Sequence, residues 1–537
     1  MKIPDLLTIE NLNFRYLIRE EPALTNISLS FSSGEVALIA GASGCGKTTL
    51  IRCINGLIPH SYRGVKSGRI MADGKDLAQL KLAEISQMIG TVLQDPERQI
   101  LGTKVINEVA FGLENLGFNR QEILERVDES LARLKISDLR DRDTFSLSGG
   151  EKQKVALAGV LAMRPRILLL DEPLASLDPA SAEETLAILR ILADEGMAIL
   201  LVEHRVEDVL KIHPEQVVFM SNGEVRYQGN AEDLDESINY RDVKLPAPMI
   251  IERARNQKPA VSFPVFELPA SNRESLVSFV DVEFNYEEGV PILHGISLDI
   301  HQGDVIAVLG PNGAGKTTLV KHAIGLLKPK AGQVLIGGQD TCKMSVAEIA
   351  QTLGYVFQSP SHMLFAPTVE EELSFGPQNL GHNKDSITKE VKEAIDIVNL
   401  SGMEQIPPLS LSFGQQKRVS IAAVLAMRSK ILVMDEPSAG QDYRNYIDFM
   451  DAILQLPNFD AILFITHDID LAVIYANRIL MVNNGQLVAD GKPQDILKDY
   501  DHLHKNRLVP TSLLDVNLKY LGKTGRFMRA EQLAQVL

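Results

Sequence analysis

A glycine-rich loop that joins an apolar strand to a helix occurs twice in this 537-residue chain and limits how the chain can fold. The copies consist of Gly41, Ala42, Ser43, Gly44, Cys45, Gly46, Lys47, Thr48 and Thr49, and of Gly310, Pro311, Asn312, Gly313, Ala314, Gly315, Lys316, Thr317 and Thr318. Backbone N–H groups of such a loop surround an anion at a helix N-terminus, the lysine reaches the outer phosphates, and the first threonine ligates Mg²⁺. A glycine-rich turn without a ligand is the alternative, and two matches in register argue against it.

The rest of the chain repeats in the same order, which indicates two α/β domains rather than several smaller ones. An alternating apolar pattern, expected of an edge strand that ends in an aromatic residue, precedes each loop at residues 7–16 and 278–286. Apolar residues at helical spacing at 119–139 and 387–400 predict a helical subdomain inserted into each domain. The predicted limits are 1–241 for the first domain, 242–272 for a linker, 273–505 for the second domain and 506–537 for the tail.

Composition and charge exclude several classes of protein. An apolar content of 45% and a charged content of 23% are those of a soluble globular protein. No apolar run reaches about 18 residues, so we expect no membrane-spanning segment. The three cysteines show no paired or metal-ligand spacing, which fits a reducing cytoplasm. A net charge of −16 disfavours binding to a nucleic-acid backbone.

Two adjacent acids follow a second apolar strand in each half of the chain. They are Asp171 with Glu172, and Asp435 with Glu436. The carboxyl edge of the sheet, where open α/β folds bind ligands, would place them beside the phosphate loops. There the aspartate can serve Mg²⁺ and the glutamate can orient or deprotonate water. A histidine ends the next strand in both halves, at His204 and His467. A lone strand-end histidine is more often structural, but its repetition favours a functional role.

A serine-glycine motif begins a long helix in each half. The residues are Ser148, Gly149 and Gly150 in the first copy, and Ser412, Phe413, Gly414 and Gln415 in the second. Backbone N–H groups at such a helix start form an anion-binding nest. An ordinary capped helix is an equally good interpretation of the motif taken alone.

With these residues in order, the chain resembles a tandem ATP-binding cassette protein over nearly its whole length, apart from the linker and the tail. Gln94 and Gln358 match the glutamine loop of that family, and residues 176–178 and 440–442 match a further motif. The resemblance implies an α/β fold of two P-loop cassette domains, each with a mainly parallel sheet core, an antiparallel β subdomain and an inserted helical subdomain. It also implies that the cassettes pack head to tail, with ATP between the phosphate loop of one and the serine-glycine signature of the other.

The resemblance assigns roles residue by residue to two ATP sites with Mg²⁺. In the first, Tyr16 stacks on adenine, residues 41–49 bind phosphates, Thr48, Gln94 and Asp171 surround Mg²⁺, Glu172 acts on water, His204 contacts the terminal phosphate, and Ser412, Gly414 and Gln415 close the site. In the second, these roles fall to Tyr286, residues 310–318, Thr317, Gln358, Asp435, Glu436, His467, Ser148, Gly149 and Gly150. Phe413 replaces a glycine of the family pattern, which predicts looser closure and slower hydrolysis at the first site.

The segments after the two glutamines, residues 94–117 and 358–381, are similar to the cassettes of energy-coupling-factor importers. The resemblance implies a fused ATPase that drives uptake of a vitamin, a vitamin precursor or a transition-metal ion. Its partners would be an integral membrane coupling subunit and a substrate-binding membrane subunit. The chain would lie on the cytoplasmic face of the cell membrane, and residues 95–105 and 359–369 would receive a coupling helix, unless they form a mobile surface loop.

Two other functions stay open. A tandem sugar-import ATPase is the closer rival, although the segments after the glutamines do not resemble that group. A soluble tandem-cassette ATPase acting on ribosomes or nucleic acid is the second. Such proteins carry a longer, strongly charged helical linker or a cysteine-rich domain, whereas this chain has a proline-bearing linker and three cysteines. We therefore expect no nucleic-acid partner.

Overall fold

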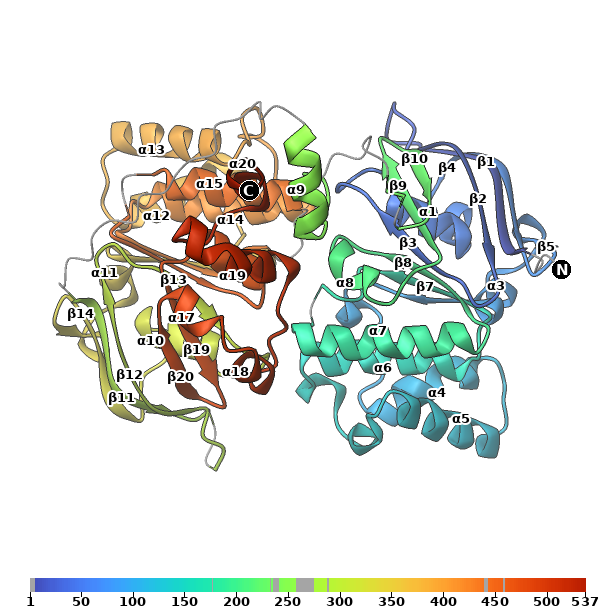
Figure 1. Ribbon diagram of the computed structural model, residues 1–537, viewed down its shortest axis with the longest axis horizontal. Coiled ribbons are helices and arrows are strands. Elements are labelled where there is room, and N and C mark those ends of the chain that lie inside the picture. The colour runs from blue at the N-terminus through green and yellow to red at the C-terminus, as the bar shows by residue number, and fades with distance from the viewer. Residues whose placement is uncertain are drawn as a thin grey trace. The chain divides into compact units, whose positions relative to one another are not determined.

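The computed structural model describes residues 5–175, 177–231, 233–234, 241–256, 275–286, 289–438, 443–456 and 459–537. They form two compact units, which divide in sequence between Leu245 and Pro246 (Figure 1). Each unit contains a four-stranded antiparallel sheet, a six-stranded sheet and surrounding helices. This architecture confirms the predicted α/β fold of two cassette domains. Among the described residues, no helix combines the length and apolar character needed to cross a membrane.

The six-stranded sheet of the first unit has the order β10-β9-β3-β8-β7-β6, and only the β9–β10 pair is antiparallel. Its strands are β3 (Val36–Ala40), β6 (Ile89–Val92), β7 (Ile167–Asp171), β8 (Ala198–Val202), β9 (Gln216–Ser221) and β10 (Glu224–Gly229). All residues of β3, β7 and β8 are buried, as expected for parallel strands covered on both faces. Because β3 lies next to β8, and β8 next to β7, the glycine loop and the acid pair emerge at the same edge of the sheet.

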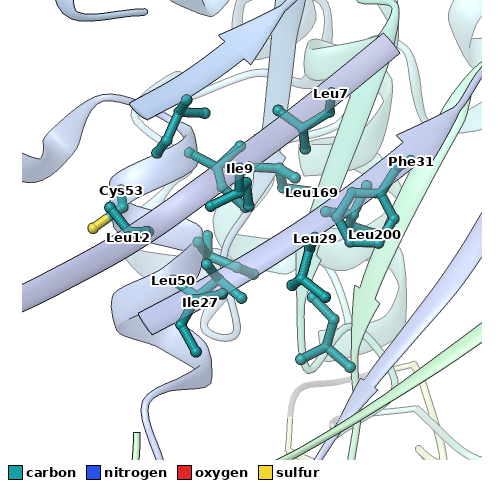
Figure 2. Close-up of a cluster of buried hydrophobic side chains, with 14 of the residues drawn as sticks. Leu7, Ile9, Leu12, Ile27, Leu29, Phe31, Leu50, Cys53, Leu169 and Leu200 are labelled. Carbon is teal, nitrogen blue, oxygen red and sulfur yellow. The ribbon is translucent and has the colours of Figure 1, made fainter. Parts of the chain in front are cut away.

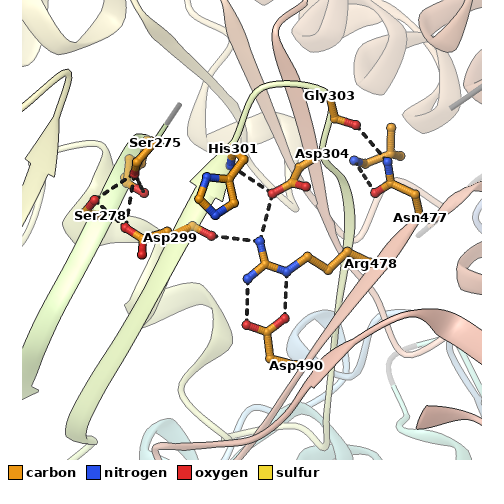
Figure 3. Close-up of polar contacts among 11 residues, drawn as sticks. Ser275, Ser278, Asp299, His301, Gly303, Asp304, Asn477, Arg478 and Asp490 are labelled. Carbon is orange, nitrogen blue, oxygen red and sulfur yellow. Dashed lines mark hydrogen bonds and ion pairs between the residues drawn. The ribbon is translucent and has the colours of Figure 1, made fainter. Parts of the chain in front are cut away.

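The second unit repeats this sheet with the order β16-β17-β18-β13-β19-β20. Its strands are β13 (Val305–Leu309), β16 (Leu353–Val356), β17 (Ile431–Asp435), β18 (Ala461–Ile465), β19 (Arg478–Asn483) and β20 (Gln486–Gly491). Arg478, at the start of β19, links three segments of this unit (Figure 3). Its guanidinium makes two hydrogen bonds to Asp490 of β20, at 2.7 and 2.6 Å, and one to Asp304, at 2.9 Å. The sheet is thus tied to the turn that leads into β13.

The patterned segments before the two loops are interior strands, so the prediction of edge strands is wrong. The antiparallel sheets have the orders β2-β1-β4-β5 and β12-β11-β14-β15. Their strands are β1 (Asp5–Tyr16), β2 (Leu24–Ser32), β4 (Gly64–Ala72), β5 (Lys75–Asp76), β11 (Ser275–Phe284), β12 (Leu293–His301), β14 (Ala331–Ile336) and β15 (Gln339–Asp340). Alternation reports that one face of a strand is buried, but it does not report how many strands pair with it.

The buried face of each antiparallel sheet packs on the parallel sheet. In the first unit, Leu7, Ile9 and Phe31 form one cluster with Leu169 and Leu200 (Figure 2). The equivalent cluster of the second unit combines residues of β11 and β12 with residues of β17 and β18. In each unit, one hydrophobic core therefore holds the antiparallel sheet against the parallel sheet that carries the glycine loop and the acid pair.

The predicted helical subdomains are present in both units. They consist of α4 (Val105–Asn115), α5 (Arg120–Arg133) and α6 (Gly149–Ala162), and of α12 (Val369–Asn379), α13 (Lys384–Ile397) and α14 (Phe413–Ala426). Further helices are α1 (Lys47–Ile54), α2 (Leu57–His60), α3 (Leu82–Met88), α7 (Pro179–Asp194), α8 (Val206–Leu210), α10 (Lys316–Ala323), α11 (Val346–Ala350), α15 (Tyr443–Leu454), α16 (Ile469–Tyr475), α17 (Pro493–Ile496) and α18 (Tyr500–Lys505).

The segment predicted as an irregular linker contains a helix, α9 (Ala247–Asn256), which packs in the second unit against the tail helices α19 (Ser512–Thr524) and α20 (Ala530–Val536). Figure 1 shows this green helix beside the red C-terminal segment. Of the prolines that suggested an irregular chain, Pro246 precedes α9 and Pro248 lies in its first turn, where proline is tolerated. Residues 257–272 of the predicted linker lie outside the described part of the chain.

Candidate active sites

Both glycine loops have the geometry of a phosphate cradle. Gly46 and Gly315 are in left-handed conformations, with φ of 110° and 98°, and each caps the helix that begins at the loop lysine. The Nζ of Lys47 donates to the carbonyls of Gly41 and Ala42 at 2.7 and 2.9 Å. Lys316 repeats both contacts in the second loop, at 2.8 and 2.9 Å. Each ammonium is thereby held against the first two residues of its loop.

The loop threonines meet the strand-end aspartates. The hydroxyl of Thr317 donates to Asp435 Oδ2 at 2.9 Å, and that of Thr48 lies 3.5 Å from Asp171 Oδ1. Hydroxyl and carboxylate oxygens are the ligands that Mg²⁺ prefers. The structure therefore brings together two of the three predicted metal-site residues in each unit.

The strand-end glutamates face the predicted histidines. Glu172 Oε1 lies 3.0 Å from His204 Nε2, and Glu436 Oε1 lies 3.0 Å from His467 Nδ1. Both glutamates have positive φ, of 50° and 47°. Non-glycine residues in that conformation concentrate at functional sites, because local strain must be offset by surrounding contacts. Among the described residues, the buried Oε2 of Glu436 has no hydrogen-bond partner, so it is available to a water molecule.

The two glutamine loops differ. In the first unit, the side-chain amide of Gln94 donates to Glu172 Oε2 at 2.6 Å. In the second, the backbone carbonyl of Gln358 accepts a bond of 2.8 Å from Lys417. Gln94 thus bonds the Oε2 atom of Glu172, whereas the equivalent Oε2 atom of Glu436 has no hydrogen-bond partner among the described residues. The two sites are therefore not identical.

Burial and mutual repulsion separate the pKa values of the adjacent acids. Burial, with the charge of Glu172, raises the pKa of Asp171 to about 6. Burial also opposes ionisation of Glu172, but the hydrogen bond and charge of His204 keep the pKa of Glu172 below its usual value. The pKa of Asp435 is likewise raised and that of Glu436 lowered, by burial and by His467 respectively. Each site therefore holds an ionised glutamate suited to orienting water.

The tyrosines predicted to stack on adenine lie beside the helices that follow the loops. The hydroxyl of Tyr16 is 3.2 Å from Thr49 Oγ1, and that of Tyr286 is 3.3 Å from Thr318 Oγ1. Arg52 also donates to Tyr16 at 3.3 Å and stacks on Tyr62. Both tyrosines are therefore held next to the phosphate loop of their own unit.

The serine-glycine motifs are helix starts, as predicted. Ser148 and Ser412 cap α6 and α14 in capping boxes with Glu151 and Gln415. The cap satisfies the orphan N–H groups of each helix, so this geometry also suits the ordinary capped helix. Closure of each motif over the ATP site of the other cassette stays a prediction. Ser176 and residues 440–442 of the further family motif lie outside the described residues.

Sequence reasoning missed three buried polar residues near the sites. Lys417 is fully buried, and burial lowers its pKa to about 8. Tyr355 donates to Asp435 Oδ2 at 2.9 Å. Glu203 accepts from the backbone of Leu174 at 2.8 Å. For Tyr355 and Glu203, the available signal was a polar residue inside or directly after an otherwise apolar strand.

Glu203→Gln is expected to alter the pH dependence of stability. Burial and the charge of Glu172 raise the pKa of Glu203 from 4.5 to about 7. The unfolded chain therefore loses this proton first, and stability falls as pH rises from 4.5 to 7, by about 2–3 kcal/mol. The variant lacks this loss, so its melting temperature relative to the native chain should rise between pH 4.5 and 8. A difference independent of pH would contradict the assignment.

Comparison with known proteins identifies the family. The family model described as ABC transporter matches residues 24–175 and 293–439. An ABC transporter ATP-binding protein so named in Methanosarcina mazei is 35% identical over 94% of this chain and 92% of its own length. A similarly named protein of Bacillus cereus is 34% identical over 96% of both chains.

One solved structure is also similar. It is that of cbiO1 from Clostridium perfringens, part of the ABC transporter complex cbiONQ, with 33% identity and a TM-score of 0.40 over 48% of this chain and 96% of that chain. By the family match and the full-length relatives, this chain belongs to the ABC transporter family. It is an ATP-binding motor protein with ATPase activity, which is coupled to transport.

Proposed function

We propose that the chain is the fused ATPase of an energy-coupling-factor type importer for a vitamin, a vitamin precursor or a transition-metal ion. The observation that carries the proposal is the similarity of the segments after Gln94 and Gln358 to the cassettes of those importers. It is supported by the presence of both loops, both acid pairs and both histidines in one chain. The motor would act from the cytoplasmic face of the cell membrane, with an integral coupling subunit and a substrate-binding membrane subunit.

The geometry within each unit supports hydrolysis of ATP at two sites, and we propose that these sites are completed when the cassettes pair head to tail. Thr48 with Asp171, and Thr317 with Asp435, would hold Mg²⁺, which neutralises charge on the phosphates. Glu172 or Glu436 then orients the attacking water, and the histidine beside it fixes the carboxylate and reaches the terminal phosphate. The in-line displacement is promoted mainly by positioning and charge stabilisation.

The predicted docking segments support a membrane partner because they are braced and yet expose apolar side chains. In the first unit, the buried carboxylate of Glu108 accepts from the N–H groups of Leu101 and Gly102 at 2.8 and 2.7 Å. In the second, Glu372 accepts from Phe365 and Ala366 at 2.8 and 2.7 Å. A buried carboxylate that accepts two backbone hydrogen bonds from the segment argues against the alternative of a mobile loop.

The braced segments carry exposed apolar residues. Leu101 is 69% exposed and Phe365 is 61% exposed. Phe365 packs edge to face on Phe375 of α12, with ring centroids 4.8 Å apart. Exposed aromatic residues on a rigid frame are typical of binding hot spots. We propose that the occupant is a coupling helix of the membrane subunit.

Phe365→Asp should weaken this docking. A charge in an apolar contact is expected to lower recovery of the membrane subunit about tenfold, with an unchanged melting temperature. Ile191→Asp is the matched control, because Ile191 is 57% exposed on α7, outside the proposed surface. The measurement is co-purification from detergent-solubilised native membranes. Equal recovery with both variants would count against the surface.

The proposed function itself is tested by gentle detergent purification of the tagged chain from its native membrane, with mass identification of its companions. A small integral substrate-binding protein and a transmembrane coupling subunit are expected, and the ligand of the former names the cargo. A periplasmic-type sugar import system would favour the tandem sugar-import ATPase. Ribosomal or nucleic-acid material without membrane proteins would overturn the transport assignment.

A further inference from the structure

One buried lysine joins three elements around the second candidate site. Lys417 lies on α14, the helix that begins with the signature residues, and its side chain is fully buried. Its Nζ donates to the carbonyls of Phe357 and Gln358 in the glutamine loop, at 3.0 and 2.8 Å. It also lies 3.3 Å from the carbonyl of Asp435, the last residue of β17. The signature helix, the glutamine loop and the acidic strand therefore share one ammonium group.

These contacts constrain the site more than ordinary loop packing does. An ammonium has three N–H donors and no acceptor, and a buried one is costly unless the donors are used. Here the three nearby carbonyls match the three donors, and charge-assisted bonds are roughly twice as strong as neutral ones. Displacement of Gln358 relative to Asp435 would leave part of this buried charge unpartnered. The lysine thus resists relative motion of the loop and the strand.

The described residues of the first unit include no buried lysine at the matching position. The matching residue of α6 is Gln153, which is buried, and its Nε2 has no hydrogen-bond partner among the described residues. The glutamine loop is tied to α6 instead from the surface, by Lys152 Nζ to Glu97 Oε1 at 2.5 Å. The side chain of Glu97 is 69% exposed, so salt screens this ion pair.

We propose that Lys417 is a positioning residue of the second ATP site, which fixes Gln358 relative to Asp435 and links both to the signature helix. The inference rests on the second-site assignment made under the proposed function. It makes the two sites unequal: a buried charge holds the glutamine loop of the second, whereas the Gln94–Glu172 bond and a surface ion pair hold that of the first. Lys417 acts on the geometry of hydrolysis and does not itself bind the nucleotide.

The test separates binding from turnover in the full chain. Lys417→Gln introduces the residue of the first unit, and Lys417→Met keeps the aliphatic length without the charge. Arg418→Gln is the control, because Arg418 on the same helix bonds the carbonyls of Val398 and Asn399 in the helical subdomain. Binding is measured with photoactivated 8-azido-ATP on ice, and turnover by vanadate trapping of 8-azido-ADP. A protease site inserted within residues 257–274 then separates the label on the two cassettes.

In the second cassette, both Lys417 variants should lower the ratio of trapped to bound label about tenfold, which is the loss of one charge-assisted bond expressed in rate. The Mg²⁺ concentration for half-maximal trapping should rise, while bound label changes less than twofold and Arg418→Gln behaves as the native chain. An unchanged ratio, or binding that falls in parallel with trapping, would overturn the positioning role. Absence of label on the second cassette of the native chain would instead overturn the site assignment.

Discussion

Glu172→Gln and Glu436→Gln are each expected to abolish hydrolysis at one site and to leave ATP binding intact. Glutamine keeps the size of the side chain, but it cannot accept a proton from water or carry the charge that orients it. Loss of a positioned general base typically lowers a rate by about 10²–10⁴-fold. Each single variant should therefore retain part of the steady-state ATPase activity, and the double variant should fall by that full factor.

The measurement is phosphate release by the full chain, with equilibrium ATP binding measured in parallel. His204 contacts Glu172 through Nε2 and His467 contacts Glu436 through Nδ1, each at 3.0 Å, so both sites hold an acid-histidine pair. If one substitution removed all activity and the other removed none, hydrolysis at two sites would be ruled out. If both reduced ATP binding to the same extent as turnover, the glutamates would be binding residues.

Gly310→Ala is expected to destabilise the second unit by about 3 kcal/mol or more and to abolish ATP binding there. Gly310 has φ of 147°, and a Cβ added to it would lie 2.0 Å from the carbonyl oxygen of Val482 in β19. The clash is with backbone, so rotation of a side chain cannot relieve it. Gly41 has the same problem in the first unit, with the carbonyl of Met220 at 2.2 Å.

Gly313→Ala is the matched control within the same loop. Gly313 also has positive φ, of 76°, but nothing lies within 4 Å of the added Cβ. Its expected cost is only that of the left-handed conformation, about 1 kcal/mol. Thermal melting of the full chain checks both variants. Equal destabilisation would show that conformational strain, and not close approach of β19, decides the need for glycine at position 310.

The sequence could predict those site residues that phosphate binding, metal binding and water activation require to be of a given type and in a given order along the chain. The loops, the strand-end acids and the following histidines are such parts, and the structure brings them to one sheet edge in each unit. Lys417 was not predictable in this way, because a charged residue in a helix usually marks a solvated face. Only the three carbonyls around its Nζ, which come from distant segments, reveal that it is buried.

The same limit applies to the fold. The pattern of β1 predicted a strand with one buried face, but pairing with both β2 and β4 depends on segments elsewhere in the chain. Helix α9 was missed because the helices that it packs against, α19 and α20, come more than 250 residues later in the sequence. Local periodicity reports which face of an element is apolar, and it carries no information about which remote element covers that face.

The docking of α9 on the tail has a consequence for biosynthesis. The N–H of Ala247 donates to Ser512 Oγ at 2.8 Å. The two residues are 265 positions apart in the sequence, so almost the whole second unit lies between them along the chain. Ile250 and Ile251 of α9 are buried there. On the ribosome, α9 emerges long before the tail, and its apolar face has no native cover until the last helices are made. During synthesis of the second half, we therefore expect the apolar face of α9 to lack its native partners.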